Sequence, residues 1–249
     1  MKIALVGYGA MGKQIESILL ESTHEIVSVT CKEIGDELQL EQLHEADVAI
    51  DFSSGALIHR HIGLYCQANV PAVIGTTGWD AKNKEIIKLV EASGIGIMVG
   101  SNFSAGLQTF LQVLRISARQ FASIGEYDVY GHEIHHTNKA DSPSGTAKTI
   151  CETIVSETPT KTQVEFDRPE ARITPETLHF GSIRGGVHAG LHEVTFASDA
   201  DSVTLSHDAH SRSGFARGAV SAAEYVQNRT GYMRYEELFK KGGPYEINL

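Results

Sequence analysis

The fold is decided by residues 2–13, which read KIALVGYGAMGK. The apolar run Lys2–Val6 is typical of a buried strand, and a helical pattern continues from Gly12 to Leu20. Between them stand three glycines spaced as G-x-G-x-x-G. They allow a tight turn, close approach of the backbone to a pyrophosphate, and close packing of the helix. The helix N-terminus adds unpaired N–H groups and a positive dipole end, and both favour phosphate binding.

This motif predicts a dinucleotide site. On its own the pattern is weak, because a glycine-rich turn can also serve tight packing alone. Its place directly after a strand and at the start of a helix favours the dinucleotide interpretation. The expected phosphate-binding residues are Gly7, Tyr8, Gly9, Ala10, Met11 and Gly12.

Alternating strand and helix patterns continue to about residue 100. Further strands are expected at residues 25–30, 48–52, 71–74 and 96–99, with a helix over 81–93. Strands alternating with helices of this length predict a parallel sheet covered by helices on both faces. We therefore expect an α/β fold with a Rossmann-type, doubly wound parallel sheet.

The pattern changes after Asn102. Helices are expected at 107–121, 146–156 and 214–228, a strand at 127–135, and antiparallel strands at 178–184, 191–197 and 202–208. We interpret this as an inserted α+β domain over residues 103–212 that binds substrate and carries the oligomer contacts. The dinucleotide-binding domain would then comprise residues 1–102 and 213–249.

Composition narrows the class of protein. The net charge of −10 argues against a nucleic-acid partner, which would favour a basic surface. No run of eighteen apolar residues is present, and the N-terminal apolar run is interpreted as a strand, so neither a membrane span nor a signal peptide is expected. The three cysteines are scattered and form no C-x-x-C pair, which favours a reducing cytoplasm over a disulfide framework or a zinc site.

The end of the second strand bears on the choice of cofactor. NAD-binding sheets usually place an acid about twenty residues after the glycine motif, but here Thr30 is followed by Cys31, Lys32 and Glu33. Lys32 could pair with a 2′-phosphate, which favours NADPH. Glu33 could still reach a 2′-hydroxyl, and Lys32 could equally be a solvated surface lysine. NADPH, NADH or both therefore remain open as cofactors.

The most informative stretch for chemistry is EIHHTNKADSPSGTAK, residues 133–148. His135 and Lys139 are candidate proton donors near neutral pH. Ser144, Gly145 and Thr146 begin a helix and so form a candidate carboxylate site. The alternative interpretation of this stretch is a polar loop with no catalytic role. A zinc site is not expected, because adjacent histidines on a strand point to opposite faces and no third ligand has suitable spacing.

This stretch resembles the signature of the dihydrodipicolinate reductase family, E-x-H-H-x-x-K-x-D-A-P-S-G-T-A, with Ser142 in place of the usual alanine. The similarity runs from residue 1 to about 226. Four further segments agree with the family: Gly75-Thr76-Thr77-Gly78, Ser101-Asn102-Phe103-Ser104, Arg184-Gly185-Gly186 followed by His192, and Ser211-Arg212 with Phe215-Ala216 and Gly218-Ala219.

The resemblance implies NAD(P)H-dependent reduction of 4-hydroxy-tetrahydrodipicolinate, a small cyclic dicarboxylate, in diaminopimelate and lysine synthesis. It implies that His135 is the catalytic acid/base and Lys139 the proton donor. His136 would contact substrate, and Gly145 and Thr146 would hold a carboxylate. The expected nicotinamide side is formed by Gly75, Thr76, Thr77, Gly100, Ser101, Asn102 and Phe103.

The resemblance leaves the phosphate contacts and two alternative functions open, and it bears on the expected oligomeric state. The phosphate loop is one residue shorter than the G-x-x-G-x-M-G of many members, which leaves the phosphate contacts undefined. The alternatives are a non-catalytic NAD(P)-binding sensor, which would be expected to lose His135 or Lys139, and another Rossmann dehydrogenase, which would lack the H-H-x-x-K…S-G-T stretch. A homotetramer is expected from the strand-rich residues 178–208 and from the resemblance.

Overall fold

The computed structural model describes residues 1–31, 35–166, 169, 171–240 and 242–247. Lys32 and Glu33, on which the cofactor expectation depends, lie outside the described residues. The chain divides into two compact units. Unit 1 comprises Met1–Ala105 with Arg212–Leu249, and unit 2 comprises Gly106–Ser211.

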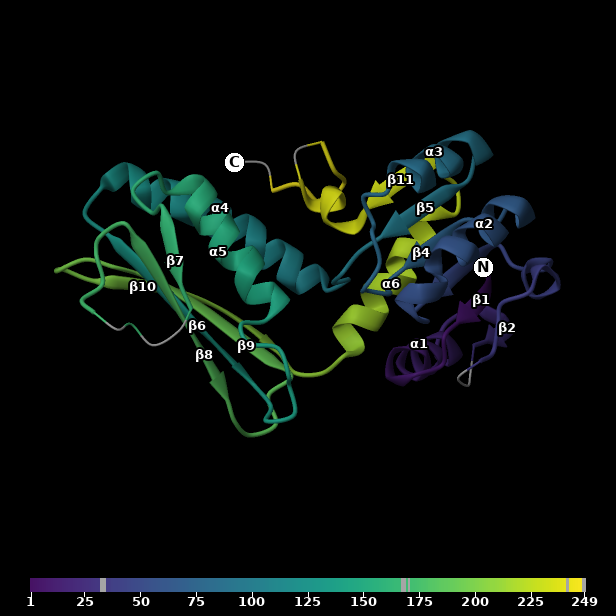
Figure 1. Cartoon of the computed structure of the whole chain (residues 1–249), viewed down its shortest axis with the longest axis horizontal. Coiled ribbons are helices and arrows are strands. Elements are labelled where there is room, and N and C mark those ends of the chain that lie inside the picture. The colour runs from purple at the N-terminus through teal and green to yellow at the C-terminus, as the bar shows by residue number, and fades with distance from the viewer. Residues whose placement is uncertain (32–34, 167–168, 170, 241, 248–249) are drawn as a thin grey trace. The chain divides into compact units, whose positions relative to one another are not determined.

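Unit 1 is built on a six-stranded sheet with the order β11-β5-β4-β3-β1-β2, in which every pair is parallel (Figure 1). Its strands are β1 Lys2–Val6, β2 Glu25–Thr30, β3 Val48–Asp51, β4 Ala72–Ile74, β5 Gly96–Val99 and β11 Gly231–Arg234. Its helices are α1 Ala10–Leu20, η1 Leu40–Leu43, η2 Gly55–Leu57, α2 Ile58–Ala68, α3 Lys84–Ser93, α6 Ser213–Val226 and η3 Tyr235–Phe239.

Both faces of this sheet are buried, because successive side chains of a strand point to opposite faces. Ile3 and Leu5 of β1 pack in one cluster with residues of α1 and α6. Ala4 and Val6 of the same strand pack in a second cluster with residues of α2 and α3. The expected doubly wound, Rossmann-type sheet is therefore confirmed.

The strand order places a reversal beside β1. From β1 the chain goes to β2 at the edge of the sheet, and it then returns to β3 on the other side of β1. In open parallel sheets the loops at the carboxyl ends of the strands separate at such a point and leave a crevice. The glycine loop, residues 7–12, lies at this point.

Unit 2 is a five-stranded mixed sheet with two helices. Its elements are α4 Ala105–Ile124, β6 Asp128–His135, α5 Gly145–Glu157, β7 Gln163–Glu165, β8 Thr177–Arg184, β9 Gly190–Ala197 and β10 Ser202–Ala209. The strand order is β10-β9-β6-β8-β7. The expectation that residues 178–184 are antiparallel was wrong, because β8 runs parallel to both β6 and β7. The chain returns from β6 through α5, and such a helical crossover brings the next strand back in the same direction.

The two faces of the unit 2 sheet differ. Val129, Glu133 and His135 of β6 are buried on the face that α4 and α5 cover in Figure 1. The alternate residue Tyr130 is 47% exposed on the opposite face, and Ile183 of β8 is 50% exposed there. The period-two pattern thus sends the polar Glu133 and His135 into the helix-covered side.

One α-helix, two strands and the three short 3-10 helices η1, η2 and η3 were not predicted from the sequence. α2 contains Gly63 and, before it, four β-branched or histidine residues, which gives a weak helical pattern. β7 has three residues and β11 has four, so each is defined by its partner strand more than by its own sequence. Within the described residues, no helix is both long enough and apolar enough to cross a membrane.

Candidate active site

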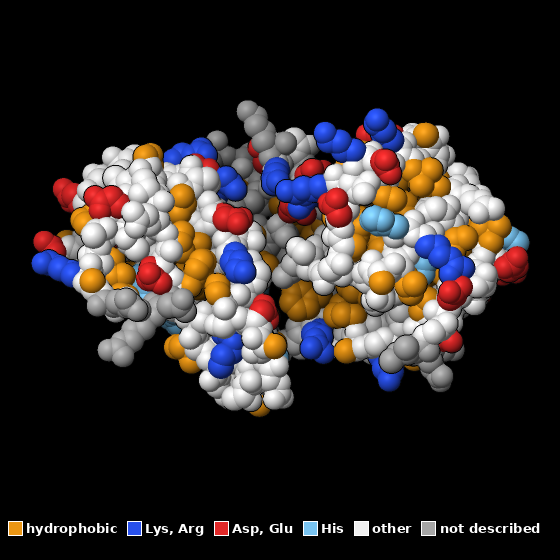
Figure 2. Space-filling model, in the orientation of Figure 1, with side chains coloured by type: hydrophobic (Ala, Val, Ile, Leu, Met, Phe, Trp, Pro, Cys, Tyr) orange, Lys and Arg blue, Asp and Glu red, His pale blue; other side chains and the backbone are white. Residues whose placement is uncertain are grey.

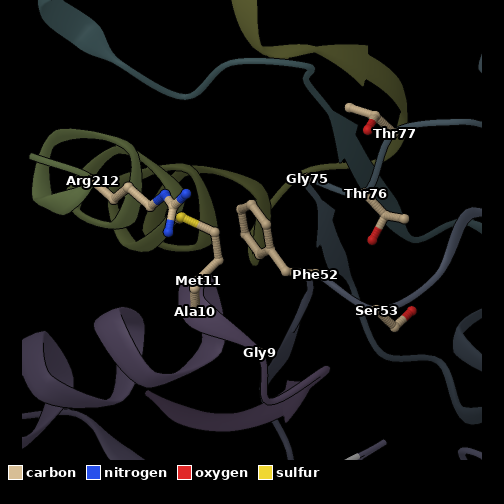
Figure 3. A pocket seen from close by; sticks show the side chains of 9 residues that line it. All are labelled: Gly9, Ala10, Met11, Phe52, Ser53, Gly75, Thr76, Thr77 and Arg212. Atoms are coloured by element: carbon tan, nitrogen blue, oxygen red, sulfur yellow. The ribbon is translucent and has the colours of Figure 1, made fainter. Parts of the chain in front are cut away.

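A pocket opens in unit 1 where the loops after β1, β3 and β4 come together (Figure 3). Gly9, Ala10 and Met11 of the glycine motif line it, as do Gly75, Thr76 and Thr77. The remaining lining residues are Phe52, Ser53 and Arg212. The pocket therefore lies at the carboxyl ends of neighbouring strands, where parallel sheets bind their ligands.

The glycines of the motif have distinct roles. Gly7 has φ +89°, and a Cβ on it would lie 2.5 Å from the carbonyl carbon of Phe52. A Cβ on Gly12 would lie 2.2 Å from the Gly7 carbonyl oxygen, so the turn and helix α1 fit together only without a side chain. A Cβ on Gly9 would meet nothing within 4 Å among the described atoms. Gly9 therefore keeps backbone open toward the pocket.

These features fit a pyrophosphate. Gly9 is the N-cap of α1 and makes no side-chain capping bond, so the first N–H groups of the helix have no acceptor from a capping side chain. Such groups, together with the helix dipole, bind phosphate oxygens well. Arg212 adds a positive charge from the N-cap position of α6, and Figure 3 shows its side chain beside Met11.

Other residues expected to bind cofactor lie around this pocket without lining it. Tyr8 donates its hydroxyl to Glu16. Phe103 is 1% exposed and packs edge-to-face on Phe52, with ring centroids 6.1 Å apart. Gly100, Ser101 and Asn102 follow β5, and the Asn102 side chain accepts a hydrogen bond from the Ser104 N–H at 2.8 Å. Phe103 thus supports the Phe52 ring from behind.

Three of the lining residues were not predicted from the sequence. Arg212 was noticed in a family segment but given no role. Phe52 and Ser53 follow directly on β3, and that position at the end of a parallel strand was the available signal. The Ser53 N–H donates to the carboxylate of Asp51 at 2.9 Å, and Asp51 is itself held by His61 at 2.8 Å. A buried contact between a carboxylate and an imidazole therefore fixes the turn beneath the pocket.

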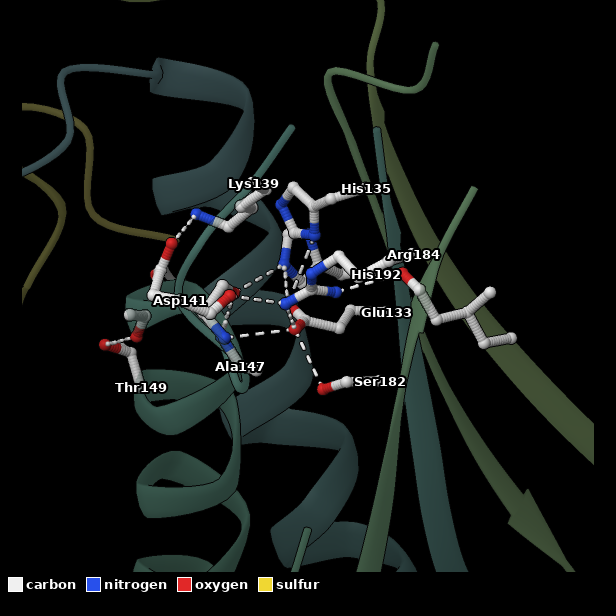
Figure 4. A network of polar contacts seen from close by, with 12 residues as sticks. Glu133, His135, Lys139, Asp141, Ala147, Thr149, Ser182, Arg184 and His192 are labelled. Atoms are coloured by element: carbon white, nitrogen blue, oxygen red, sulfur yellow. Dashed lines mark hydrogen bonds and ion pairs between the residues drawn. The ribbon is translucent and has the colours of Figure 1, made fainter. Parts of the chain in front are cut away.

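A second polar cluster lies in unit 2, on the helix-covered face of the sheet (Figure 4). Pairing between strands assembles it, because Glu133 of β6 stands opposite His192 of β9 and beside Ser182 of β8. His135 and Arg184 stand opposite each other two residues farther along β6 and β8. The candidate catalytic His135 therefore belongs to a network drawn from three strands.

Glu133 is the centre of this network and is fully buried. Its Oε1 accepts hydrogen bonds from the Ser144 backbone N–H at 3.0 Å, the Ser182 hydroxyl at 2.9 Å and the Arg184 Nη2 at 2.9 Å. A carboxylate that accepts several such bonds is stabilised in its charged form.

The second carboxylate oxygen faces two histidines. Glu133 Oε2 lies 3.4 Å from His135 Nδ1 and 3.3 Å from His192 Nε2. The two imidazole rings meet edge-to-face with centroids 5.1 Å apart. Together with Glu133 they place ligand-capable atoms within 4.8 Å of one another. The Arg184 guanidinium already neutralises this carboxylate, so the arrangement suits proton placement better than it suits a cation.

Burial and charge set the protonation states here. Burial alone would raise the pKa of the Glu133 carboxyl, but its interactions with His192, Ser144 and Arg184 hold that pKa far below the usual range. Burial lowers the pKa of His135 to about 4, and the Glu133 charge offsets only part of this effect. At neutral pH the pair is therefore an ionised carboxylate beside a neutral imidazole.

Lys139 lies at the mouth of this cluster, on the loop after β6. Its ammonium group donates to Asp141 at 2.7 Å, and the side chain is 23% exposed. The Arg184 Nη2 also donates to the Asp141 carbonyl oxygen at 2.7 Å, which ties the loop to the network. Lys139 is thus close to the cluster but keeps contact with solvent.

The N-terminus of α5 carries the expected carboxylate site. Ser144 is its N-cap, and the Ser144 hydroxyl oxygen accepts from the Ala147 N–H at 3.0 Å. Ser144 is 2% exposed, so its hydroxyl serves the helix. Gly145 is exposed and Thr146 half-buried in the first turn, where backbone N–H groups lack intrahelical acceptors. His136 is half-buried at the end of β6 and donates its N–H to the His188 carbonyl.

Comparisons with known proteins give consistent results. The family model described as dihydrodipicolinate reductase, N-terminus, matches residues 1–103, and the model for the C-terminus of the same family matches residues 106–239. A Christiangramia forsetii protein named 4-hydroxy-tetrahydrodipicolinate reductase is 36% identical over 243 residues, which is 96% of this chain and 97% of that protein. A Staphylococcus aureus protein of the same name is 36% identical over 248 residues, covering 96% and 100% of the two chains.

A solved structure agrees with these matches. It is described as dipicolinate-bound dihydrodipicolinate reductase from Paenisporosarcina sp. TG-14, and it superposes with a TM-score of 0.78 at 25% identity. The superposition covers 95% of this chain and 98% of that one.

Proposed function

Because the chain belongs to the dihydrodipicolinate reductase family, we propose that it reduces 4-hydroxy-tetrahydrodipicolinate to tetrahydrodipicolinate with NADPH or NADH, in diaminopimelate and lysine synthesis. This proposal rests on the match of both family models. The N-terminal model covers residues 1–103 in unit 1, and the C-terminal model covers residues 106–239, which include all of unit 2. The presence of His135 and Lys139 argues against a non-catalytic sensor. The H-H-x-x-K…S-G-T stretch argues against other Rossmann dehydrogenases.

The reaction adds a hydride and a proton to the substrate and releases water, so that the cofactor is oxidised and the substrate reduced. The nicotinamide of a bound cofactor supplies the hydride. This chain's residues must bind the dicarboxylate, orient it and deliver the proton. Holding a reactant in one geometry removes much of the entropic barrier of a bimolecular step.

We assign substrate binding to His136 and to the start of α5. The Gly145 and Thr146 N–H groups point along a helix N-terminus that favours a carboxylate, and Ser144 holds this turn in place. Lys139 is the proton donor in this assignment, since it is charged, close to the cluster and in contact with solvent. His135 is the second catalytic group.

Cofactor binding is assigned to unit 1. Gly7 to Gly12 hold the pyrophosphate at the start of α1, with Arg212 adding positive charge. Gly75 to Thr77 form the opposite wall of the pocket. Gly100 to Phe103 support the nicotinamide side through the packing of Phe103 on Phe52.

A coupled assay tests the function directly. Purified protein should oxidise NADPH or NADH only when the aldolase product of pyruvate and aspartate semialdehyde is supplied. Oxidation that is independent of that product, or no oxidation with either cofactor, would contradict the proposal.

NADPH is expected to serve at least as well as NADH, because Lys32 stands where NAD-specific sheets usually carry an acid. Lys32→Glu should weaken NADPH much more than NADH, since it removes a phosphate partner and adds a like charge. Initial rates with both cofactors at matched concentrations measure this. Lys13→Glu is a suitable control, and equal losses for both cofactors in Lys32→Glu would mean that Lys32 does not contact the 2′ position.

A homotetramer is our proposal for the assembly, supported by the open face of the unit 2 sheet. Tyr130 and Ile183 are half-exposed there, on neighbouring strands, although large apolar side chains are usually buried. Ile183→Asp should lower the mass measured by light scattering from that of four 27.0 kDa chains to a smaller species. Leu20→Asp, which alters an exposed apolar residue of α1 in unit 1, should leave the mass unchanged.

The remaining proposals concern the cellular compartment and the kind of partner. The three cysteines are free thiols, which supports our prediction of a reducing cytoplasm. On the face shown in Figure 2, Lys and Arg side chains are interspersed with Asp and Glu. That distribution supports a small-molecule partner over a nucleic acid.

A further inference from the structure

We propose that Glu133 is the positioning residue of the site: its carboxylate holds the proton of the neutral His135 on Nδ1 and leaves Nε2 as a hydrogen-bond and proton acceptor. Glu133 lies on the same strand and the same face as His135, two residues earlier, so the strand itself sets their spacing. The consequence for catalysis rests on the proposed function, but the protonation pattern does not.

The direction of the Glu133 carboxylate is fixed by the donors around it. Three donors hold Oε1, one from the backbone of Ser144 and two from the side chains of Ser182 and Arg184. The carboxylate cannot rotate without losing all three bonds. Oε2 is therefore fixed toward His135 Nδ1, at 3.4 Å.

The fixed carboxylate decides which nitrogen of the His135 imidazole carries the proton. A neutral imidazole carries one proton, and the other nitrogen is an acceptor. His135 Nδ1 is buried and faces a fixed negative charge, so the tautomer with the proton on Nδ1 gains Coulomb energy and the other tautomer loses it. Among the described residues His135 Nδ1 has no hydrogen-bond partner that would reverse this preference, and Glu133 Oε2 also faces His192 Nε2 at 3.3 Å.

The other ring nitrogen, His135 Nε2, lies beside Gly190. A Cβ placed on Gly190 would lie 2.9 Å from His135 Nε2. Gly190 begins β9, and a side chain at this position would press against Nε2. Glycine therefore keeps this side of Nε2 free of a side chain, as an acceptor nitrogen requires.

In the proposed reaction this protonation pattern gives His135 and Lys139 different roles. His135 Nε2 accepts a hydrogen bond or a proton from the substrate or from water, and the proton delivered to the substrate comes from Lys139. The same carboxylate fixes the start of α5 through Ser144, so one buried charge aligns the acid/base group with the expected carboxylate site.

Glu133→Gln gives a sharp test, because it should invert the tautomer. The three donors require the amide oxygen on the Oε1 side, which leaves the amide NH₂ facing His135 Nδ1. An NH₂ group is a donor, so Nδ1 must become the acceptor and the proton must move to Nε2. Nitrogen NMR of ¹⁵N-histidine-labelled protein reports this, with the His135 signals identified by their absence in His135→Gln.

We expect wild-type protein at pH 7, without ligands, to show His135 neutral and protonated on Nδ1. We expect Glu133→Gln to show Nε2 protonation, and kcat to fall by roughly 10–100-fold, the loss seen when a group that orients a metal-binding histidine is removed. Glu152→Gln is the matched control. It makes the same change of carboxylate to amide at an exposed position of α5, and it should keep the Nδ1 tautomer and kcat.

Wild-type His135 found with its proton on Nε2, or protonated on both nitrogens at pH 7, would overturn the inference even if Glu133→Gln failed to fold. An unchanged tautomer in a folded Glu133→Gln would do the same. Because the NMR measurement needs no turnover, loss of the proposed reductase activity would leave it interpretable.

Discussion

Replacing Lys139 with alanine should lower kcat by roughly 10²–10⁴-fold, the usual contribution of a general acid. The side chain is a charged donor beside the cluster around His135, and alanine removes it without disturbing a buried contact, since Lys139 pairs with the exposed Asp141. His135→Ala should lower kcat by a similar factor. Steady-state kinetics with saturating cofactor, together with a fluorescence titration of NADPH, separates loss of chemistry from loss of binding.

Two controls make this result specific. Lys148→Ala removes an exposed lysine of α5 and should leave kcat near wild type. Thr146→Val keeps the backbone N–H but removes the hydroxyl of a residue expected to hold the carboxylate. It should chiefly raise KM for the dicarboxylate, because such a contact is made equally in the ground and transition states. Near-normal kcat in Lys139→Ala would mean that the lysine is only a loop charge. Collapse of NADPH binding instead would assign residues 133–148 to the cofactor.

Gly12→Ala should weaken cofactor binding and lower the turnover rate by roughly 10²-fold, the loss of rate expected when reacting groups are misplaced by about 1 Å. The new Cβ would lie 2.2 Å from the Gly7 carbonyl oxygen, so the loop or helix α1 must move. The thermal unfolding temperature should fall as well, because the same movement opens the packing of α1 on β1. Fluorescence titration with NADPH, steady-state kinetics and a thermal melt measure these effects.

Gly9→Ala separates binding from folding. A Cβ there meets nothing in the protein, so the melting temperature should stay near wild type, but the methyl group would occupy the space assigned to the pyrophosphate. Gly63→Ala in the middle of α2 also meets nothing and should leave cofactor affinity unchanged, with a small gain in stability. Full cofactor affinity in Gly9→Ala would place the pyrophosphate elsewhere.

Much of unit 1 could be predicted from the sequence because its signals are local. The strand, turn and helix of residues 2–20 depend on contacts within about twenty residues, and the strands β3 and β5 are short apolar runs. β11 was missed for the opposite reason. Its four residues become a strand only by pairing with β5, far away in the sequence.

In the candidate site, too, some features follow from the local sequence and others depend on strand pairing. The order of side chains from His135 to Thr146 is fixed by one loop, so the sequence by itself determined which groups stand together at the end of β6 and the start of α5. Glu133 belonged to the same quoted stretch, yet nothing local gave it a role. That role comes from Ser182, Arg184 and His192, which reach Glu133 only through the parallel and antiparallel pairing of β8 and β9.

The sequence therefore determined the kind of chemistry, and the tertiary structure decided the state of the groups that perform it. A histidine in an open loop would titrate near its ordinary pKa. His135 does not, because the sheet and α4 and α5 bury it beside a carboxylate that four strand and helix positions hold ionised. Desolvation and the field of a fixed charge depend on the distances between distant segments of the chain, and no local pattern of residues carries that information.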